Sequence, residues 1–86
     1  MFTAYLGSIA KKFLKKAESE VYQRIKDEIR KLENEPFPAE VERVKGLKGR
    51  TAFRVRVGDY RIQYVVYQDK KEILVFKIDR RDKAYN

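Results

Sequence analysis

The sequence predicts an α+β domain in which two helices cover one face of an antiparallel sheet. Two observations carry this prediction. Apolar residues recur at helical spacing through the first part of the chain, and from Phe53 onwards they alternate as in a strand. With 86 residues and 43% hydrophobic composition, one domain with one core is expected over residues 1–86. The expected order is a short N-terminal strand, an antiparallel two-helix hairpin and a three-stranded antiparallel β-meander.

The first elements are a strand and a helix. Residues 2–6 are expected to form the strand, which Gly7-Ser8 ends. Ser8 is the expected N-cap of the first helix, because its hydroxyl can accept a hydrogen bond from the first turn. One stripe of that helix is apolar and consists of Ile9, Ala10, Phe13, Leu14 and Ala17.

The second helix is expected from residue 18 or 19 to residue 34. Its apolar stripe, at spacings of three, four and three, consists of Tyr22, Ile25, Ile29 and Leu32. On the charged side, Glu28 can pair with Arg24 or Lys31. The two prolines of the segment 36–50 end the helix, and this segment is expected as a loop or a short extended stretch.

Residues 53–66, FRVRVGDYRIQYVV, are two alternating runs joined by Gly58-Asp59, which is a strong hairpin signal. The tight turn predicts an apolar face made of the pairs Val57 with Tyr60, Val55 with Ile62 and Phe53 with Tyr64. On the other face Arg56 is expected opposite Arg61, and Arg54 opposite Gln63. Like charges opposed across a ladder are destabilising, so these three guanidiniums indicate an anion-binding face.

A second hairpin is expected to join residues 61–67 to residues 73–78 through a loop at 69–71. The predicted register pairs Val66 with Leu74, Tyr64 with Phe76, Ile62 with Ile78, Gln63 with Lys77 and Arg61 with Asp79. The polar face then collects Arg54, Arg56, Arg61 and Lys77, with Arg80, Arg81 and Tyr85 at its exit and only Asp79 and Glu72 to neutralise it. We therefore favour anion binding over an ordinary solvated polar face.

Composition limits the classes of function. The net charge of +8 points to a polyanion such as RNA, DNA or an acidic protein, although a Lys/Glu-rich surface can also serve solubility alone. The chain has no cysteine or histidine, so no disulfide, metal site or cofactor is expected. It has no apolar run of membrane-spanning length and no secretory pattern, so a cytoplasmic protein without a membrane partner is expected.

The polar face could also cleave RNA. RNA carries its own nucleophile, the 2′-hydroxyl, and cleavage then needs alignment, charge stabilisation and proton transfer. Guanidiniums can stabilise the phosphorane charge, and Tyr85 could donate a proton to the leaving oxygen. Packing of the Tyr85 ring against the sheet is the alternative, and the residues leave both open.

The segments VKGLKG, FRVRVGDYRIQYVV and ILVFKIDRRDKAY resemble the RelE/ParE toxin superfamily, most closely its RelE-type and archaeal members. The resemblance spans essentially the whole chain. It implies the RelE-like microbial RNase fold and a metal-independent, ribosome-dependent mRNA endonuclease. Such a toxin cuts mRNA in the ribosomal A site, beside rRNA, by attack of the 2′-hydroxyl. A cognate antitoxin inhibits it, and the complex binds operator DNA through the antitoxin. The alternatives are a ParE-type inhibitor of DNA gyrase and a catalytically weak relative.

The resemblance also assigns residues. Arg54 and Arg56 fall on the basic pair of the first hairpin strand, Arg61 on the arginine after the turn tyrosine, Arg81 near the end of the last strand and Tyr85 on the C-terminal catalytic tyrosine. The expected catalytic residues are therefore Arg54, Arg56, Arg61, Arg81 and Tyr85, and the expected RNA-binding residues are Lys48, Arg50, Lys77 and Arg80. Arg54 and Arg56 stand where some RelE toxins carry lysines. Because arginine is a poor general base, charge stabilisation is their expected role.

Overall fold

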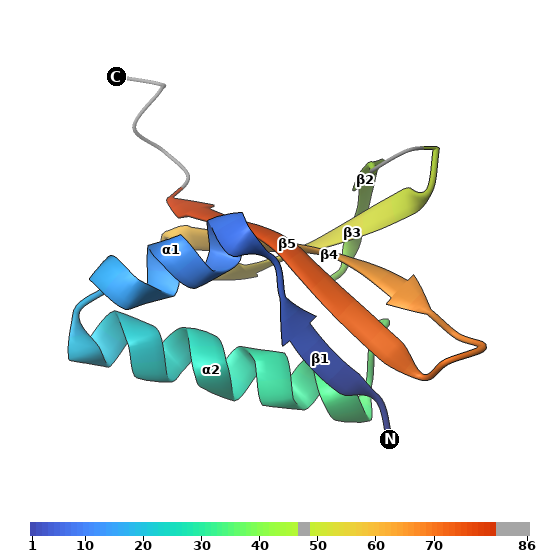
Figure 1. Cartoon of the computed structure of the whole chain (residues 1–86), viewed down its shortest axis with the longest axis horizontal. Helices are drawn as coiled ribbons and strands as arrows, with labels where there is room; N and C mark the ends of the chain where they lie inside the picture. Colours follow the sequence, from blue (N-terminus) through green and yellow to red (C-terminus); the bar gives the residue numbers. More distant parts are fainter. Residues whose placement is uncertain (47–48, 81–86) are drawn as a thin grey trace.

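The computed structural model describes residues 1–46 and 49–80. Its elements are β1 (Thr3–Leu6), α1 (Ser8–Lys16), α2 (Ser19–Asn34), β2 (Glu42–Lys45), β3 (Thr51–Val57), β4 (Tyr60–Tyr67) and β5 (Glu72–Arg80). The five strands form one sheet in the order β1-β5-β4-β3-β2, and both helices lie on the same side of it (Figure 1). The α+β class is confirmed. Within the described residues, no helix is long and apolar enough to span a membrane.

The predicted N-terminal strand is present and pairs in parallel with β5. Its start is tied to the end of α2, because the Phe2 amide donates to the Glu33 carbonyl at 2.8 Å. The Ala4 amide also donates to the Glu33 side chain, at 2.8 Å to Oε2. These bonds hold the second helix against the sheet edge.

The three-stranded meander was an incomplete prediction, because the segment 36–50 contains a further strand. Strand β2 pairs antiparallel with β3 and extends the sheet by one strand. Directly after β2, the backbone at Gly46 lies close to the backbone of residues 50–52. A Cβ at this position would overlap the Arg50 carbonyl oxygen and lie 2.9 Å from the Ala52 amide nitrogen, so only glycine fits. The sequence of β2, ERVK, lacks an alternating apolar pattern, and so it gave no strand signal.

The helix bounds agree closely with the prediction, but the cap does not. Gly7 occupies the N-cap position with extended backbone, and Ser8 is the first helical residue, so the predicted Ser8 cap is wrong. The Gly7 amide donates to the Val75 carbonyl at 2.8 Å, which fixes the helix start on β5. Glu28 pairs with Lys31 at 3.9 Å, and Lys31 is one of the two partners that were predicted for it.

One core lies between the helices and the sheet. Its buried members are Ala10, Leu14, Ile25, Ile29, Leu32, Val55, Ile62, Tyr64, Ile73, Val75 and Ile78. Two residues of the predicted apolar stripes point outward: Ile9 is 59% exposed and Tyr22 is 40% exposed. Val21 packs against the core instead of Tyr22.

The register of the first hairpin is confirmed at all five predicted pairs. The second hairpin is confirmed only near its open end, at the pairs Arg61 with Asp79, Ile62 with Ile78 and Gln63 with Lys77. A register shift between Gln63 and Tyr64 then pairs Tyr64 with Val75 and Val66 with Ile73, so the predicted partners Phe76 and Leu74 were wrong. A β-bulge inserts one extra residue, and this places Val75 and Ile73 in the core.

Tyr64 connects the core to the segment that follows α2. Its side chain is 0% exposed, and its hydroxyl donates to the Pro36 carbonyl at 2.7 Å. Burial raises the pKa of the Tyr64 phenol well above its ordinary value, and the charges of Glu28 and Glu40 raise it further. Tyr64 is therefore a structural tyrosine, which holds the loop leading to β2.

Candidate functional site

Four cations lie on the side of the sheet that faces away from the helices. They are Arg54 and Arg56 of β3, Arg61 of β4 and Lys77 of β5, and we call this surface the arginine face. Alternation along each strand places them there, because the neighbouring residues Val55, Ile62 and Ile78 are in the core. Across the strands they form two rows, Glu42–Arg54–Gln63–Lys77 and Arg56–Arg61–Asp79. The predicted opposition of Arg56 and Arg61 is confirmed.

The Arg61 guanidinium is held by Asp79 through two hydrogen bonds. Nε donates to Oδ1 at 3.1 Å and a terminal nitrogen donates to Oδ2 at 2.9 Å. Lys77 Nζ lies 3.8 Å from the same Oδ2 atom. The Arg61 and Asp79 side chains are only 23% and 28% exposed, so water competes weakly for this pair. The pairing predicted for Asp79 is confirmed, and it fixes the orientation of the guanidinium.

A second carboxylate reaches the arginine face from β2. The Arg54 Nε atom donates to Glu42 Oε1 at 2.9 Å, and a terminal nitrogen of Arg54 lies 2.8 Å from the same oxygen. The sequence led us to expect only Asp79 and Glu72 as neutralising residues, and this was wrong because β2 was not predicted. Glu42 is thus the residue of the site that sequence reasoning missed.

Arg56 is the most accessible guanidinium of the arginine face. Its side chain is exposed, and no ion pair joins it to any residue that the structure describes. It lines a hollow of about 260 Å³ together with Arg54, Glu40 and Glu42. The face therefore combines two oriented guanidiniums with one exposed guanidinium, an arrangement suited to a phosphate group.

The predicted RNA-binding residues do not all gather on this face. Lys77 belongs to it, but Arg80 lies opposite Tyr60 on the side of the sheet that carries the helices. The Arg80 guanidinium is 5.9 Å from the centre of the Tyr60 ring and 3.8 Å from the Asp59 carboxylate. Arg80 therefore belongs to a different surface from Arg61.

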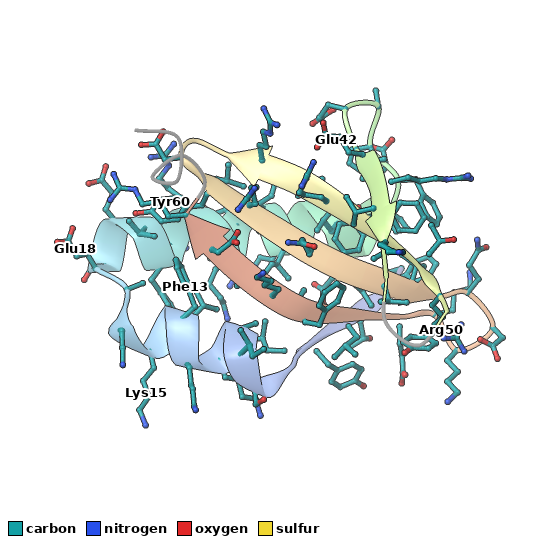
Figure 2. The ribbon with its side chains drawn as sticks, turned by 90° about the horizontal axis from the view of Figure 1, so that it is seen from above. Phe13, Lys15, Glu18, Glu42, Arg50 and Tyr60 are labelled. Carbon is teal, nitrogen blue, oxygen red and sulfur yellow. The ribbon has the colours of Figure 1, made fainter. Side chains whose placement is uncertain are left out.

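Arg50 lies at the other end of the sheet from Tyr60, as Figure 2 shows. Its guanidinium stacks on the Tyr67 ring at 4.5 Å. This contact explains the position of Arg50 without a ligand. Lys48, Arg81 and Tyr85 lie outside the described residues.

A cavity of about 530 Å³ lies beside Arg80, where the turn between the helices meets the end of the sheet. Its lining is Phe13, Lys16, Ala17, Glu18, Val21, Tyr60 and Arg80. The Phe13 and Tyr60 rings meet edge to face with centroids 5.7 Å apart, and Figure 2 shows them pointing toward one another. The lining combines apolar side chains with two cations, Lys16 and Arg80, and one carboxylate, Glu18. Only the packing of the helices on the sheet reveals it, since its residues are scattered in sequence.

Among the residues that the structure describes, no group of acidic side chains is arranged to hold a metal ion. The sequence also supplies no histidine or cysteine.

Comparison with known proteins places this geometry in a family. Residues 5–85 match the family model described as the ParE toxin of the type II toxin–antitoxin system parDE. A protein of Methanocaldococcus jannaschii named toxin RelE1 is 42% identical over 64 residues, which cover 73% of this chain and 71% of that protein. A chain of the archaeal RelE–RelB complex from Pyrococcus horikoshii OT3 superposes with a TM-score of 0.81 at 28% identity, covering 95% of this chain and 97% of the other. The isolated Escherichia coli RelE toxin shares the fold, with a TM-score of 0.78 at 18% identity over 99% of this chain and 92% of its own.

Proposed function

This chain belongs to the ParE toxin family of type II toxin–antitoxin systems, and we propose that it is a RelE-type toxin that cleaves mRNA on the ribosome. The observation that supports the proposal is the arginine face, where Arg56 lies directly opposite the oriented Arg61. The names of the similar proteins support the RelE branch. We place the activity in the cytoplasm, where mRNA is translated.

The proposed chemistry is attack of a ribose 2′-oxygen on the adjacent phosphorus atom. A bond forms between O2′ and phosphorus, and the bond from phosphorus to the 5′-oxygen of the next nucleotide breaks. Negative charge develops on the phosphoryl oxygens, and guanidiniums that are already oriented stabilise it without reorganisation. Arg61 meets this requirement through Asp79, and Arg54 meets it through Glu42. The 2′-proton leaves to solvent, and Tyr85 is proposed to protonate the departing 5′-oxygen.

The test is primer extension on mRNA bound to programmed ribosomes. The purified protein should add cuts in the A-site codon, and Arg61→Ala should lower the cleavage rate by about 10²-fold or more, as loss of one oriented charge donor does elsewhere. Arg30→Ala is the matched control, because Arg30 is an exposed arginine of α2 that is far from this face in the fold. The proposal is wrong if the wild-type protein adds no cuts, or if Arg61→Ala cuts as fast as Arg30→Ala.

Inhibition of DNA gyrase is the second candidate function, because the matching family model is that of ParE. It requires no cleavage of RNA. A supercoiling assay with purified gyrase separates the two functions: inhibited supercoiling with intact mRNA would support the ParE-type function. Normal growth during full induction would instead indicate a catalytically weak relative.

A cognate antitoxin is the proposed partner, as the RelE chain of Pyrococcus horikoshii is found in a complex with RelB. The cavity beside Arg80 supports a partner segment that is both apolar and acidic, because Phe13 and Val21 line it together with Arg80. Such a contact does not depend on charge alone, so high salt should fail to separate the purified complex. Dissociation at moderate salt would contradict this. Binding of the complex to operator DNA is proposed to occur through the antitoxin.

A further inference from the structure

The exposed residues of α1 are four lysines together with Ser8 and Ile9. Lys11, Lys12, Lys15 and Lys16 are all exposed, and the helix SIAKKFLKK contains no acidic residue. In the part of the chain that the structure describes, no ion pair involves any of these four lysines. Helix α2 differs, since its charges are mixed and partly paired along the helix, as in Asp27 with Arg30. We call these four residues the α1 lysine face.

This arrangement is unfavourable for the helix itself. Lys11 and Lys15, and likewise Lys12 and Lys16, are four residues apart, a spacing at which like charges repel. With nine residues, α1 is too short to be stable without its packing on the sheet. The helix dipole favours Lys15 and Lys16 in the last turn, but it does not favour Lys11 and Lys12 in the middle. A polyanionic ligand would remove the repulsion among all four.

The chemistry of the face favours a phosphate backbone over other polyanions. Lysine is depleted from protein–protein interfaces, whereas lysines supply the salt-dependent contacts to nucleic-acid phosphates. An anionic membrane fits less well, because the apolar side of α1 is already buried on the sheet through Ala10 and Leu14. RNA is the nucleic acid consistent with the arginine face.

We propose that the α1 lysine face binds the phosphates of an RNA segment other than the one at the arginine face. The two surfaces point in different directions: the arginine face lies on the helix-free side of the sheet, and Lys15 points outward from α1 away from the sheet (Figure 2). The protein is thus held between two RNA segments. This inference deepens the proposed function and rests on it only for the identity of the second segment as ribosomal RNA.

The experiment compares two triple variants with equal charge. One is Lys11→Gln/Lys12→Gln/Lys15→Gln, and the control neutralises the exposed lysines Lys31, Lys45 and Lys70 on other elements. Each variant removes three positive charges from a chain of net charge +8. Affinity for a fluorescent, unstructured oligouridylate is measured by anisotropy over a range of NaCl concentrations. Glutamine has nearly the helix propensity of lysine, so α1 should remain folded, which circular dichroism checks.

A phosphate contact contributes roughly 0.7 to the slope of log K against log salt for a single strand. The α1 variant should therefore lose about two units of slope if its three lysines all contact phosphates, and its affinity at about 0.1 M salt should fall by about 100-fold. The control variant should keep the wild-type slope. Equal slopes for the two variants would overturn the inference. So would an α1 variant that keeps its RNA affinity but loses antitoxin binding, since the partner would then be a protein.

Primer extension on ribosomes, run in parallel, separates this inference from the proposed function. Absence of cleavage by the wild-type protein together with a lower slope for the α1 variant would refute the nuclease and support the lysine face. Cleavage by the wild-type protein together with equal slopes for the two triple variants would support the nuclease and refute the lysine face. If the triple variant fails to fold, the single substitution Lys12→Gln gives the same test with an expected loss of about 0.7 in slope, and an unchanged slope would count against the inference.

Discussion

Replacing Tyr64 by phenylalanine should destabilise the protein at neutral pH and have little effect in alkali. At neutral pH the substitution removes the hydrogen bond to the Pro36 carbonyl, which measures 2.7 Å. The acceptor then loses its buried donor, and we expect the free energy of unfolding to fall by about 1–2 kcal/mol. The segment between α2 and β2 should loosen first, since this bond anchors it to the core.

The alkaline behaviour follows from the raised pKa of the Tyr64 phenol, which burial moves above the ordinary value of 10.0. A raised pKa in the folded state means that the wild-type protein keeps this stability below pH 10 and loses it as the pH rises further. By about pH 11 the unfolded phenol is mostly ionised, and this lowers the wild-type stability by about 1.4 kcal/mol. The Tyr64→Phe variant lacks the phenol, so the two stabilities should converge near that pH.

The assay is urea denaturation of wild type and variant at about pH 7 and about pH 11, because other titrating groups then cancel in the difference. Tyr22→Phe is the control: Tyr22 is 40% exposed on α2, and its loss should change the stability little at either pH. A wild-type advantage over Tyr64→Phe that is as large at the higher pH as at neutral pH would refute the reasoning.

Three further substitutions test the site and its support. Glu42→Gln should raise the affinity for a short RNA several-fold by removing the carboxylate that neutralises Arg54, and a lower affinity in the anisotropy assay would contradict this. Gly46→Ala should cost about 1–3 kcal/mol, because its methyl group would overlap backbone that cannot move without opening the β2–β3 pairing; an unchanged urea midpoint would be the opposite result. Asp79→Asn should lower the free energy of unfolding by about 1–2 kcal/mol, because Arg61 loses a bidentate charged partner. Urea denaturation at neutral pH measures this change, and an unchanged stability would show that the pair is not structural.

The first hairpin was predictable because two signals agree. Alternation fixes which residues share a face, and the two-residue turn at Gly58-Asp59 fixes the register, so one solution remains. Gly58 has a φ of 59°, as this turn requires. The helices were predictable in extent because of their apolar spacing, although the stripe does not tell which of Val21 and Tyr22 turns inward.

The register of the second hairpin could not be predicted from the apolar pattern alone. Residues 73–76, ILVF, are apolar in both phases, so a shift by one residue exchanges one apolar set for another and alternation cannot exclude it. The bulge chooses Ile73 and Val75 for the core, because the helices cover those side chains. The packing of the helices on Ile73 and Val75 cannot be predicted from the local sequence.

The hairpin register predicted which strand cations share the arginine face, but the sequence reasoning missed Glu42 and placed Arg80 at the exit of that face, whereas Arg80 lies on the helix side of the sheet. Arg56 and Arg61 follow from the hairpin register alone. Glu42 reaches Arg54 only because β2 joins the sheet, and the edge strand ERVK has no periodic pattern that would announce it. The pairing partner β3 is the next strand in the sequence, so the missing signal was the absence of apolar alternation in β2 itself.

The ion pairs of the arginine face reduce the positive charge that is available to bind a polyanion, but they fix the orientation of the guanidiniums. Asp79 fixes Arg61 and Glu42 fixes Arg54, so these guanidiniums are suited to a reacting phosphate whose geometry is strict. The lysines of α1 have the opposite properties: they are exposed, flexible and without ion partners among the described residues, which suits contacts that need no fixed geometry. Under the two proposals, affinity and positioning lie on different elements, and this explains how a chain of net charge +8 can neutralise part of its own site.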